Sequence, residues 1–413
     1  MMRKGRKEVK RKALAIASAS VMAATMMMGA VPTMAAGTNY GTNIGGTKVT
    51  NFDKYLVMDQ EANVPNATFS YAITAGTAVK YDVAGKKVQI LAGVDADKVT
   101  MKGVGTTEAN KIAFSTDDKD SAKTDVNAMV KDYDNTKQKY VKKTAELDFS
   151  NVKFTEPGIY RYIITESGDN QGITNDANLI RVVDVYVHDA SDASGKKLTV
   201  AGYVLHAKAD DVASGDDQGS KGDDPEGKSQ GYTNTYDTSD LTFRKEVSGN
   251  QASRDKYFEF TVRITGAVAG TIYDVDITEA DATSGDNTAT TDENKGKANV
   301  TKLTVGADGT VEQKFYLQHG QQIKIKGLAK DTKYTVTENE EDYKSTASGV
   351  NGYKDATAGN VESKDLNTSY LNTKEGIIPT GVIMTVAPFA AVTLLGGVGA
   401  VTLKMKKRRE DEE

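Results

Sequence analysis

The sequence predicts an all-β protein built from two β-sandwich domains in tandem. Apolar and polar residues alternate with a period of two in several runs, including residues 68–73, 257–262 and 322–325. This period is typical of strands with one buried face. Clusters of Gly, Asn and Asp separate the runs, and no long amphipathic helix interrupts them. The length of 413 residues is sufficient for two or three domains.

The composition argues against several kinds of reactive site and binding partner. The chain has no cysteine, which excludes disulfides, thiolate metal sites and cysteine nucleophiles. Its three histidines, His188, His206 and His319, lie far apart in the sequence, which disfavours a histidine-based metal site or catalytic triad. The formal net charge is -5 although the N-terminus is basic, so the remainder of the chain is acidic. An acidic surface argues against a nucleic-acid partner.

The first element is a secretory signal peptide over residues 1–36. Residues 3–12 are rich in Lys and Arg, residues 13–31 are apolar, and the small residues Ala35 and Ala36 follow. This three-part order is typical of an export signal that is removed by signal peptidase. A transmembrane anchor is the alternative, but the Ala-, Ser- and Met-rich segment that ends at small residues favours the signal.

The next two elements are the predicted sandwiches, at residues 37–237 and 238–375. The first includes an Asp-, Gly- and Ser-rich stretch at 208–230, and the second a similar stretch at 280–297. We expect both stretches to be exposed loops. Calcium binding at 208–230 is the alternative, but the spacing of its acidic residues matches no EF-hand loop.

The same three short motifs occur in both predicted domains. Each contains Phe-x-Lys, then Tyr-x-[Ile/Val]-Thr-Glu, then Tyr-x-Asn-Thr, in the same order and with unequal loops between. The repeated segments are 52–54, 162–166 and 232–235 in the first half, and 243–245, 334–338 and 370–373 in the second. A preserved order around unequal loops indicates duplicated domains.

Lys, Glu and Asn in this order suggest a specific reaction. A Lys amine can attack an Asn carboxamide, release ammonia and leave an isopeptide bond. Burial lowers the pKa of Lys and raises that of Glu, so that a protonated Glu can relay protons between the reacting groups. Lys48 competes weakly with Lys54 for this role, whereas Arg244 cannot replace Lys245 because a guanidinium stays protonated.

Two segments in the first half, Ala145–Ser150 and Glu156–Tyr162, resemble the streptococcal pilin isopeptide linkage domain of T-antigen-like major (backbone) pilins. The second half resembles the smaller Cna protein B-type domain. The resemblance implies Ig-like β-sandwiches that each form their own Lys–Asn bond with the help of a Glu. The implied bonds are Lys54–Asn234 with Glu166, and Lys245–Asn372 with Glu338.

The last element, residues 376–413, resembles a sortase sorting signal of Gram-positive bacteria. The motif Ile377-Ile378-Pro379-Thr380-Gly381 precedes an uncharged stretch at 382–403 and a basic tail at 404–413. A helix over that stretch is about 33 Å long, enough to cross a bilayer with the basic tail in the cytoplasm. Sorting signals usually read Leu-Pro-x-Thr-Gly, and here Pro is one place later. The resemblance implies cleavage between Thr380 and Gly381; a plain tail anchor is the alternative.

These resemblances imply a non-enzymatic structural subunit of a sortase-assembled pilus, exported and anchored to peptidoglycan. Its partners would be a sortase, further copies of itself, and accessory pilins or a host ligand. The family joins subunits through a Lys shortly before the first domain's Asn, which corresponds approximately to Lys228, with Lys221 as the rival. A monomeric wall-anchored adhesin would share all other features and is the alternative. The sequence has no phosphate-binding loop, Ser-His-Asp arrangement or metal-ligand spacing, so no metal or cofactor is expected.

Overall fold

The computed structural model describes residues 44–83, 86–126, 130, 133–207, 229–279, 288–289, 292–350 and 352–377. The described residues form strands and three short 3-10 helices, which confirms the predicted all-β class. None of the helices in these ranges is long and apolar enough to cross a bilayer. The predicted signal peptide lies outside the described residues, and so does the predicted sorting signal apart from Gly376 and Ile377.

The strands fall into two groups. The first group is β1 (Ile44–Gly46), β2 (Val49–Asp59), β3 (Ala67–Ala75), β4 (Val79–Val83), β5 (Lys86–Ala92), β6 (Thr100–Met101), β7 (Lys111–Phe114), β8 (Gln138–Asp148), β9 (Gly158–Ser167), β10 (Ile173–Thr174), β11 (Ile180–Asp189), β12 (Leu198–His206) and β13 (Gly231–Tyr236). The second is β14 (Thr238–Ser248), β15 (Phe258–Thr265), β16 (Ile272–Glu279), β17 (Lys302–Thr304), β18 (Thr310–Leu317), β19 (Gln321–Ala329), β20 (Lys333–Glu338), β21 (Lys344–Ala347), β22 (Ala358–Asn360) and β23 (Leu366–Thr373). The 3-10 helices span Ala96–Lys98, Thr116–Ser121 and Asp292–Asn294.

The first group forms a sandwich of two sheets. One sheet has the order β1-β12-β11-β9-β3-β7, with the β4–β5 hairpin joined to β9, and the other has the order β10-β13-β2-β8-β6. Along β9, Tyr160, Tyr162 and Ile164 alternate inward and are almost fully buried. They pack with Phe52 and Leu147 of the opposite sheet in one continuous apolar core, as the period of two predicts.

The second group forms a smaller sandwich. A sheet of order β17-β16-β19-β14-β23-β21 faces a sheet of order β18-β15-β20-β22. Phe243 of the first sheet packs against Phe260 and Phe315 of the second, with ring centroids 5.4 and 6.0 Å apart. These aromatic rings lie in a core separate from that of the first sandwich, so each sandwich has its own hydrophobic core.

In both sandwiches, a strand near the start of the group pairs in parallel with the last strand. β2 pairs with β13 with Lys54 opposite Tyr232, and β14 pairs with β23 with Lys245 opposite Tyr370. The Asn of each Tyr-x-Asn-Thr motif is two residues beyond the Tyr, and therefore on the same face of its strand. The repeat in the sequence thus corresponds to the same register in both domains.

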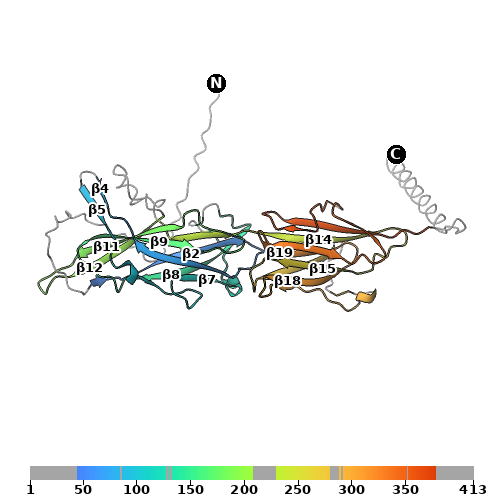
Figure 1. Cartoon of the computed structure of the whole chain (residues 1–413), viewed down its shortest axis with the longest axis horizontal. Helices are drawn as coiled ribbons and strands as arrows, with labels where there is room; N and C mark the ends of the chain where they lie inside the picture. Colours follow the sequence, from blue (N-terminus) through green and yellow to red (C-terminus); the bar gives the residue numbers. More distant parts are fainter. Residues whose placement is uncertain are drawn as a thin grey trace, which may run out of the picture.

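The two sandwiches lie end to end (Figure 1). Asn63, in the turn after β2, donates to the carbonyl oxygen of Ile272 at 3.0 Å and to Asp274 Oδ2 at 2.9 Å. Lys326 of β19 forms an ion pair with Glu61 at 3.1 Å. Ala329, at the end of β19, packs into the core of the first sandwich. Direct contacts therefore connect the sandwiches in addition to the chain between β13 and β14.

Candidate functional site

The first predicted trio comes together in the interior of the first sandwich. Lys54 lies on β2, Glu166 on β9 and Asn234 on β13, and their exposed fractions are 0%, 1% and 0%. Lys54 Nζ is 2.6 and 2.7 Å from the two carboxylate oxygens of Glu166. Charged side chains are rarely buried this completely unless they are paired. The structure therefore pairs Lys54, and not Lys48, with Glu166.

Aromatic side chains surround this pair. Lys54 Nζ lies 4.0 Å from the centroid of the Phe69 ring, and the Tyr71 hydroxyl donates to Glu166 Oε2 at 2.8 Å. Burial keeps the pKa of Tyr71 well above 10, so this hydroxyl stays a donor. Burial also lowers the pKa of Lys54 from 10.5 to about 8, although Glu166 opposes the shift. The lowered pKa makes the neutral, nucleophilic form of this amine more accessible than in an ordinary lysine.

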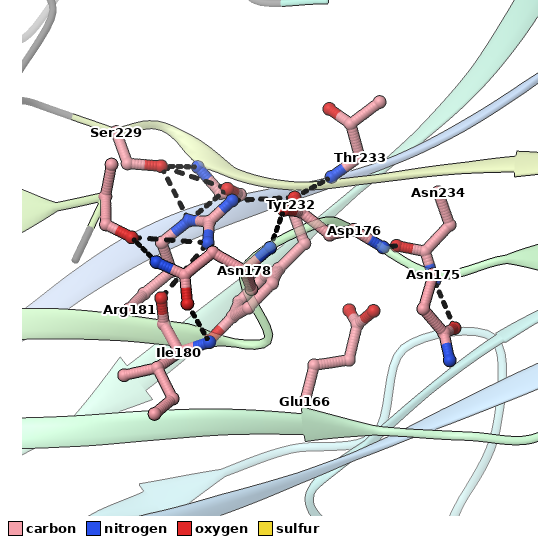
Figure 2. A network of polar contacts seen from close by, with 12 residues as sticks. Glu166, Asn175, Asp176, Asn178, Ile180, Arg181, Ser229, Tyr232, Thr233 and Asn234 are labelled. Carbon is pink, nitrogen blue, oxygen red and sulfur yellow. Dashed lines mark hydrogen bonds and ion pairs between the residues drawn. The ribbon is translucent and has the colours of Figure 1, made fainter.

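The Asn234 carboxamide is held by the loop between β10 and β11. Its Oδ1 accepts from the main-chain N–H of Asp176 at 3.1 Å, and its Nδ2 donates to Asn175 Oδ1 at 3.0 Å. Figure 2 shows the Glu166 carboxylate below the Asn234 carboxamide, whose two polar atoms are bonded to Asp176 and Asn175. Asn234 is thus fixed by residues that the sequence motifs did not include.

The second trio has the same position in the second sandwich. Lys245 on β14 forms an ion pair with Glu338 at the end of β20, and their side chains are 0% and 2% exposed. Asn372 on β23 is fully buried and donates to Glu338 Oε1 at 3.1 Å. Ser345 Oγ donates to Glu338 Oε2 at 3.0 Å. One carboxylate therefore contacts the amine, the carboxamide and a hydroxyl.

The lysine of the second site has surroundings like those of Lys54. Lys245 Nζ lies 4.2 Å from the centroid of the Phe258 ring, and burial lowers its pKa to about 8. Burial raises the pKa of Glu338, against the effect of Lys245. Both shifts favour the neutral forms of the pair, which are a nucleophilic amine and a carboxylic acid. Arg244 instead pairs with Glu246.

A tyrosine of each repeat fixes the geometry between the strands. Tyr232 donates to the carbonyl oxygen of Ile164 at 2.8 Å, and Tyr370 donates to that of Val336 at 2.6 Å. Each acceptor lies two residues before the site's Glu. The Tyr of Tyr-x-Asn-Thr thus connects the strand with Asn to the strand with Glu, which explains why the motif contains it.

Four predicted residues lie outside the described residues: Lys221, Lys228, Thr380 and Gly381. Among the described residues, no group of His, Asp and Glu could hold a metal ion. The motifs also missed contributors that the structure reveals. Tyr71, Asn175, Asp176 and Arg181 surround the first site, and Ser345 contacts the second.

Both halves of the chain are similar to known protein domains. The Spy0128-like isopeptide containing domain matches residues 94–237, and a domain of unknown function, DUF7601, matches residues 239–374. A pilin from Streptococcus pyogenes serotype M1 is 28% identical over 403 residues, which cover 92% of this chain and 96% of the relative.

Two solved structures are also similar to the chain. The major pilin from Streptococcus pyogenes is 22% identical, with 80% of this chain and 99% of that chain covered and a TM-score of 0.49. The major pilin T3.2 from Streptococcus pyogenes serotype GAS13637 is 21% identical, with 80% and 100% covered and a TM-score of 0.45. The residues that match the Spy0128-like isopeptide containing domain, 94–237, include Glu166 and Asn234.

Proposed function

We propose that this chain is the structural subunit of a covalent surface pilus, and that each of its sandwiches is closed by a self-formed Lys–Asn isopeptide bond. The observation that carries the proposal is the pair of buried trios, Lys54–Glu166–Asn234 and Lys245–Glu338–Asn372, at the same register in two domains. The similarity to a pilin along 92% of the chain supports the assignment to a pilus.

The reaction at each site needs three changes. The neutral amine of Lys attacks Cγ of the Asn carboxamide, the bond from Cγ to Nδ2 breaks, and a proton from the amine reaches Nδ2, so that ammonia leaves. The lowered pKa of each Lys, about 8, supports the first change. Glu166 and Glu338 contact the amines and can carry the proton. Each glutamate acts once within its own chain, so the protein is not an enzyme with turnover.

The bonds connect strands that are distant in the sequence. Each bond would join a strand near the start of its domain to the last strand, and would close a loop longer than about 100 residues. Closing such a loop stabilises a fold by roughly 5 kcal/mol on entropic grounds. Unlike a disulfide, an amide bond cannot be reduced. A chain without cysteine would gain permanent cross-links in this way.

Assembly would use the two ends of the chain. A sortase would cleave between Thr380 and Gly381 and transfer Thr380 to a Lys amine of another copy, Lys228 or its rival Lys221, or to peptidoglycan at the base. The described chain supports this order, because β23 ends at Thr373 and the exposed Ile377 lies four residues further on. A cell-surface pilus anchored in the wall is the expected location.

The intact mass of the mature protein tests the two cross-links. We expect it to lie about 34 Da below the value calculated from the sequence, because each bond releases one ammonia of about 17 Da. Fragmentation of a tryptic digest should identify the linked pairs Lys54–Asn234 and Lys245–Asn372. A mass equal to the calculated value would contradict the proposal.

The pH dependence of stability offers a second test, with an Asn372→Ala variant whose Lys245 stays a free amine. The folded-state pKa of Lys245 is about 8, below its ordinary value of 10.5. Between these values the unfolded chain binds more protons, so the free energy of unfolding rises with pH, by up to about 1.4 kcal/mol per unit. Urea denaturation at pH 8 to 9.5 should show this rise in the variant. In wild type, Lys245 Nζ would be an amide nitrogen that does not titrate, so this rise should be absent. An equal dependence of the unfolding free energy on pH in variant and wild type would contradict the cross-link.

A further inference from the structure

The two sites hold their carboxamides differently. In the first, both polar atoms of Asn234 are bonded to the loop between β10 and β11, to Asp176 N and Asn175 Oδ1. In the second, Asn372 Nδ2 is bonded to Glu338 itself, and Asn372 Oδ1 has no hydrogen-bond partner in the part of the chain that the structure describes. The first site therefore has a support for its carboxamide that the second lacks.

Obligate donors and acceptors fix the orientation of the first carboxamide. The Gly168 carbonyl can only accept, so the atom of Asn175 that contacts it at 3.0 Å must be Nδ2. Asn175 Oδ1 then faces Asn234 and accepts from Nδ2. The Asp176 N–H can only donate, so it faces Asn234 Oδ1. These three contacts agree with one another and leave one orientation of the Asn234 side chain.

The loop itself is anchored by a part-buried ion pair. Asp176 Oδ2 accepts from Arg181 Nη2 at 2.7 Å and from the main-chain N–H of Thr233 at 2.8 Å. Arg181 is only 6% exposed, and its Nε donates to Ser229 Oγ at 3.0 Å and to the Gly231 carbonyl at 2.7 Å. Figure 2 shows this network continuing from Ser229 through Arg181 to Asp176 and Thr233. The network connects the loop to β13 on both sides of Tyr232.

A close approach of strands makes one position in this network specific for glycine. Gly231 has a φ of +153°, and a Cβ there would overlap the carbonyl oxygen of Asp53 on β2. Because glycine has no Cβ, the main chain of β13 can approach that of β2 closely at this position, one residue before Tyr232. The network is therefore built around the strand pair that carries Lys54 and Asn234.

We infer that the loop at Asn175 and Asp176 is part of the reaction machinery of the first domain. When Lys54 Nζ attacks Cγ of Asn234, negative charge develops on Oδ1, and the Asp176 N–H is placed to stabilise it. Asn175 Oδ1 holds Nδ2, the nitrogen that takes up the proton from the amine and leaves as ammonia. Arg181 is a positioning residue that acts through Asp176. In the second domain, Glu338 is the only group that binds the carboxamide within the part of the chain that the structure describes.

This inference depends on the proposed isopeptide function, and one experiment separates the two. The full chain is synthesised in a cell-free system, samples are quenched at timed intervals, and each bond is followed by mass spectrometry of its linked tryptic peptides. With Asn175→Ala we expect the Lys54–Asn234 bond to form on the order of tenfold to a hundredfold more slowly, as when one polar contact to a reacting group is lost. The Lys245–Asn372 bond in the same molecules should form at its wild-type rate.

Two controls distinguish chemistry from folding. Asn170→Ala removes the same side chain from the turn before β10, where Asn170 bonds to the main chain of Thr68, and should leave both rates unchanged. In a Glu166→Ala background, where no first bond is expected, adding Asn175→Ala should change the unfolding midpoint no more than adding Asn170→Ala does.

The experiment distinguishes a failure of the proposed function from a failure of the inference about the loop. If wild type forms neither bond, the proposed function fails. If wild type forms both and Asn175→Ala forms the first bond at the wild-type rate, the inference is wrong and the proposed function stands. The inference is also wrong if Asn175→Ala slows both bonds equally, or if it lowers the unfolding midpoint of the Glu166→Ala background clearly more than Asn170→Ala does.

Discussion

Replacing Glu338 with alanine is expected to leave the second sandwich without its cross-link and to destabilise it by at least about 5 kcal/mol. The loss of a closed loop longer than about 100 residues accounts for that figure. Lys245 adds to it, because its side chain is 0% exposed and Glu338 is its ion-pair partner. A buried amine without a counter-ion typically costs a further ~3–5 kcal/mol unless it loses its proton.

Mass and thermal unfolding should change together in this variant. After correction for the substitution, the Glu338→Ala protein should be about 17 Da heavier than wild type, and calorimetry should show an earlier transition. Glu340→Ala is a suitable control, because Glu340 is exposed on the same strand-to-turn segment and should change neither quantity. A Glu338→Ala protein that still loses two ammonia molecules would contradict the assigned role of Glu338.

The second large effect is expected in cell-wall extracts of the native organism. Wild type should give a ladder of high-mass bands on immunoblots under denaturing conditions, because covalent polymers survive detergent. Lys228→Ala should reduce the ladder to a single band, since the amine that accepts Thr380 would be gone. Lys228 is preferred to Lys221 because it lies six residues before Asn234, close to the position that the family resemblance implies.

The matched control for this experiment is Lys221→Ala, which should leave the ladder intact. If the ladder disappears with Lys221→Ala and persists with Lys228→Ala, the acceptor is Lys221. A single band in wild type would instead favour the monomeric wall-anchored adhesin. The intramolecular cross-links would be unaffected by that outcome.

Much of the site could be predicted because the chain contains it twice. Lys54 or Glu166 alone would look like an ordinary strand residue, but the order Lys, Glu, Asn recurs in both halves with aromatic neighbours. Alternation with a period of two was sufficient to predict β3, β15 and β19. It could not have identified β2 or β11, where runs of consecutive residues are buried. Repetition therefore supplied the information that a single sequence otherwise lacks.

The remainder of the first site has no such signal. The short polar segment with Asn175, Asp176 and Asn178 is typical of any turn, and its sequence does not recur in the second half. Tyr71 is one of many tyrosines, and its contact with Glu166 depends on how β3 pairs with β9. Contacts between the sandwiches, such as that of Asn63 with Ile272, depend on loop conformations that local sequence does not determine.

The parallel pairing of β14 with β23 has a mechanical consequence. The chain enters β14 at Thr238 and leaves β23 at Thr373, so drawing the two ends apart makes the strands slide past each other instead of peeling. All hydrogen bonds between them are then strained together, and they must break almost at once. With the proposed cross-link in place, tension would run along β14 to Lys245, cross to Asn372 and leave the domain. The residues between, from Glu246 to Leu371, would lie outside the path of the tension and could not be stretched.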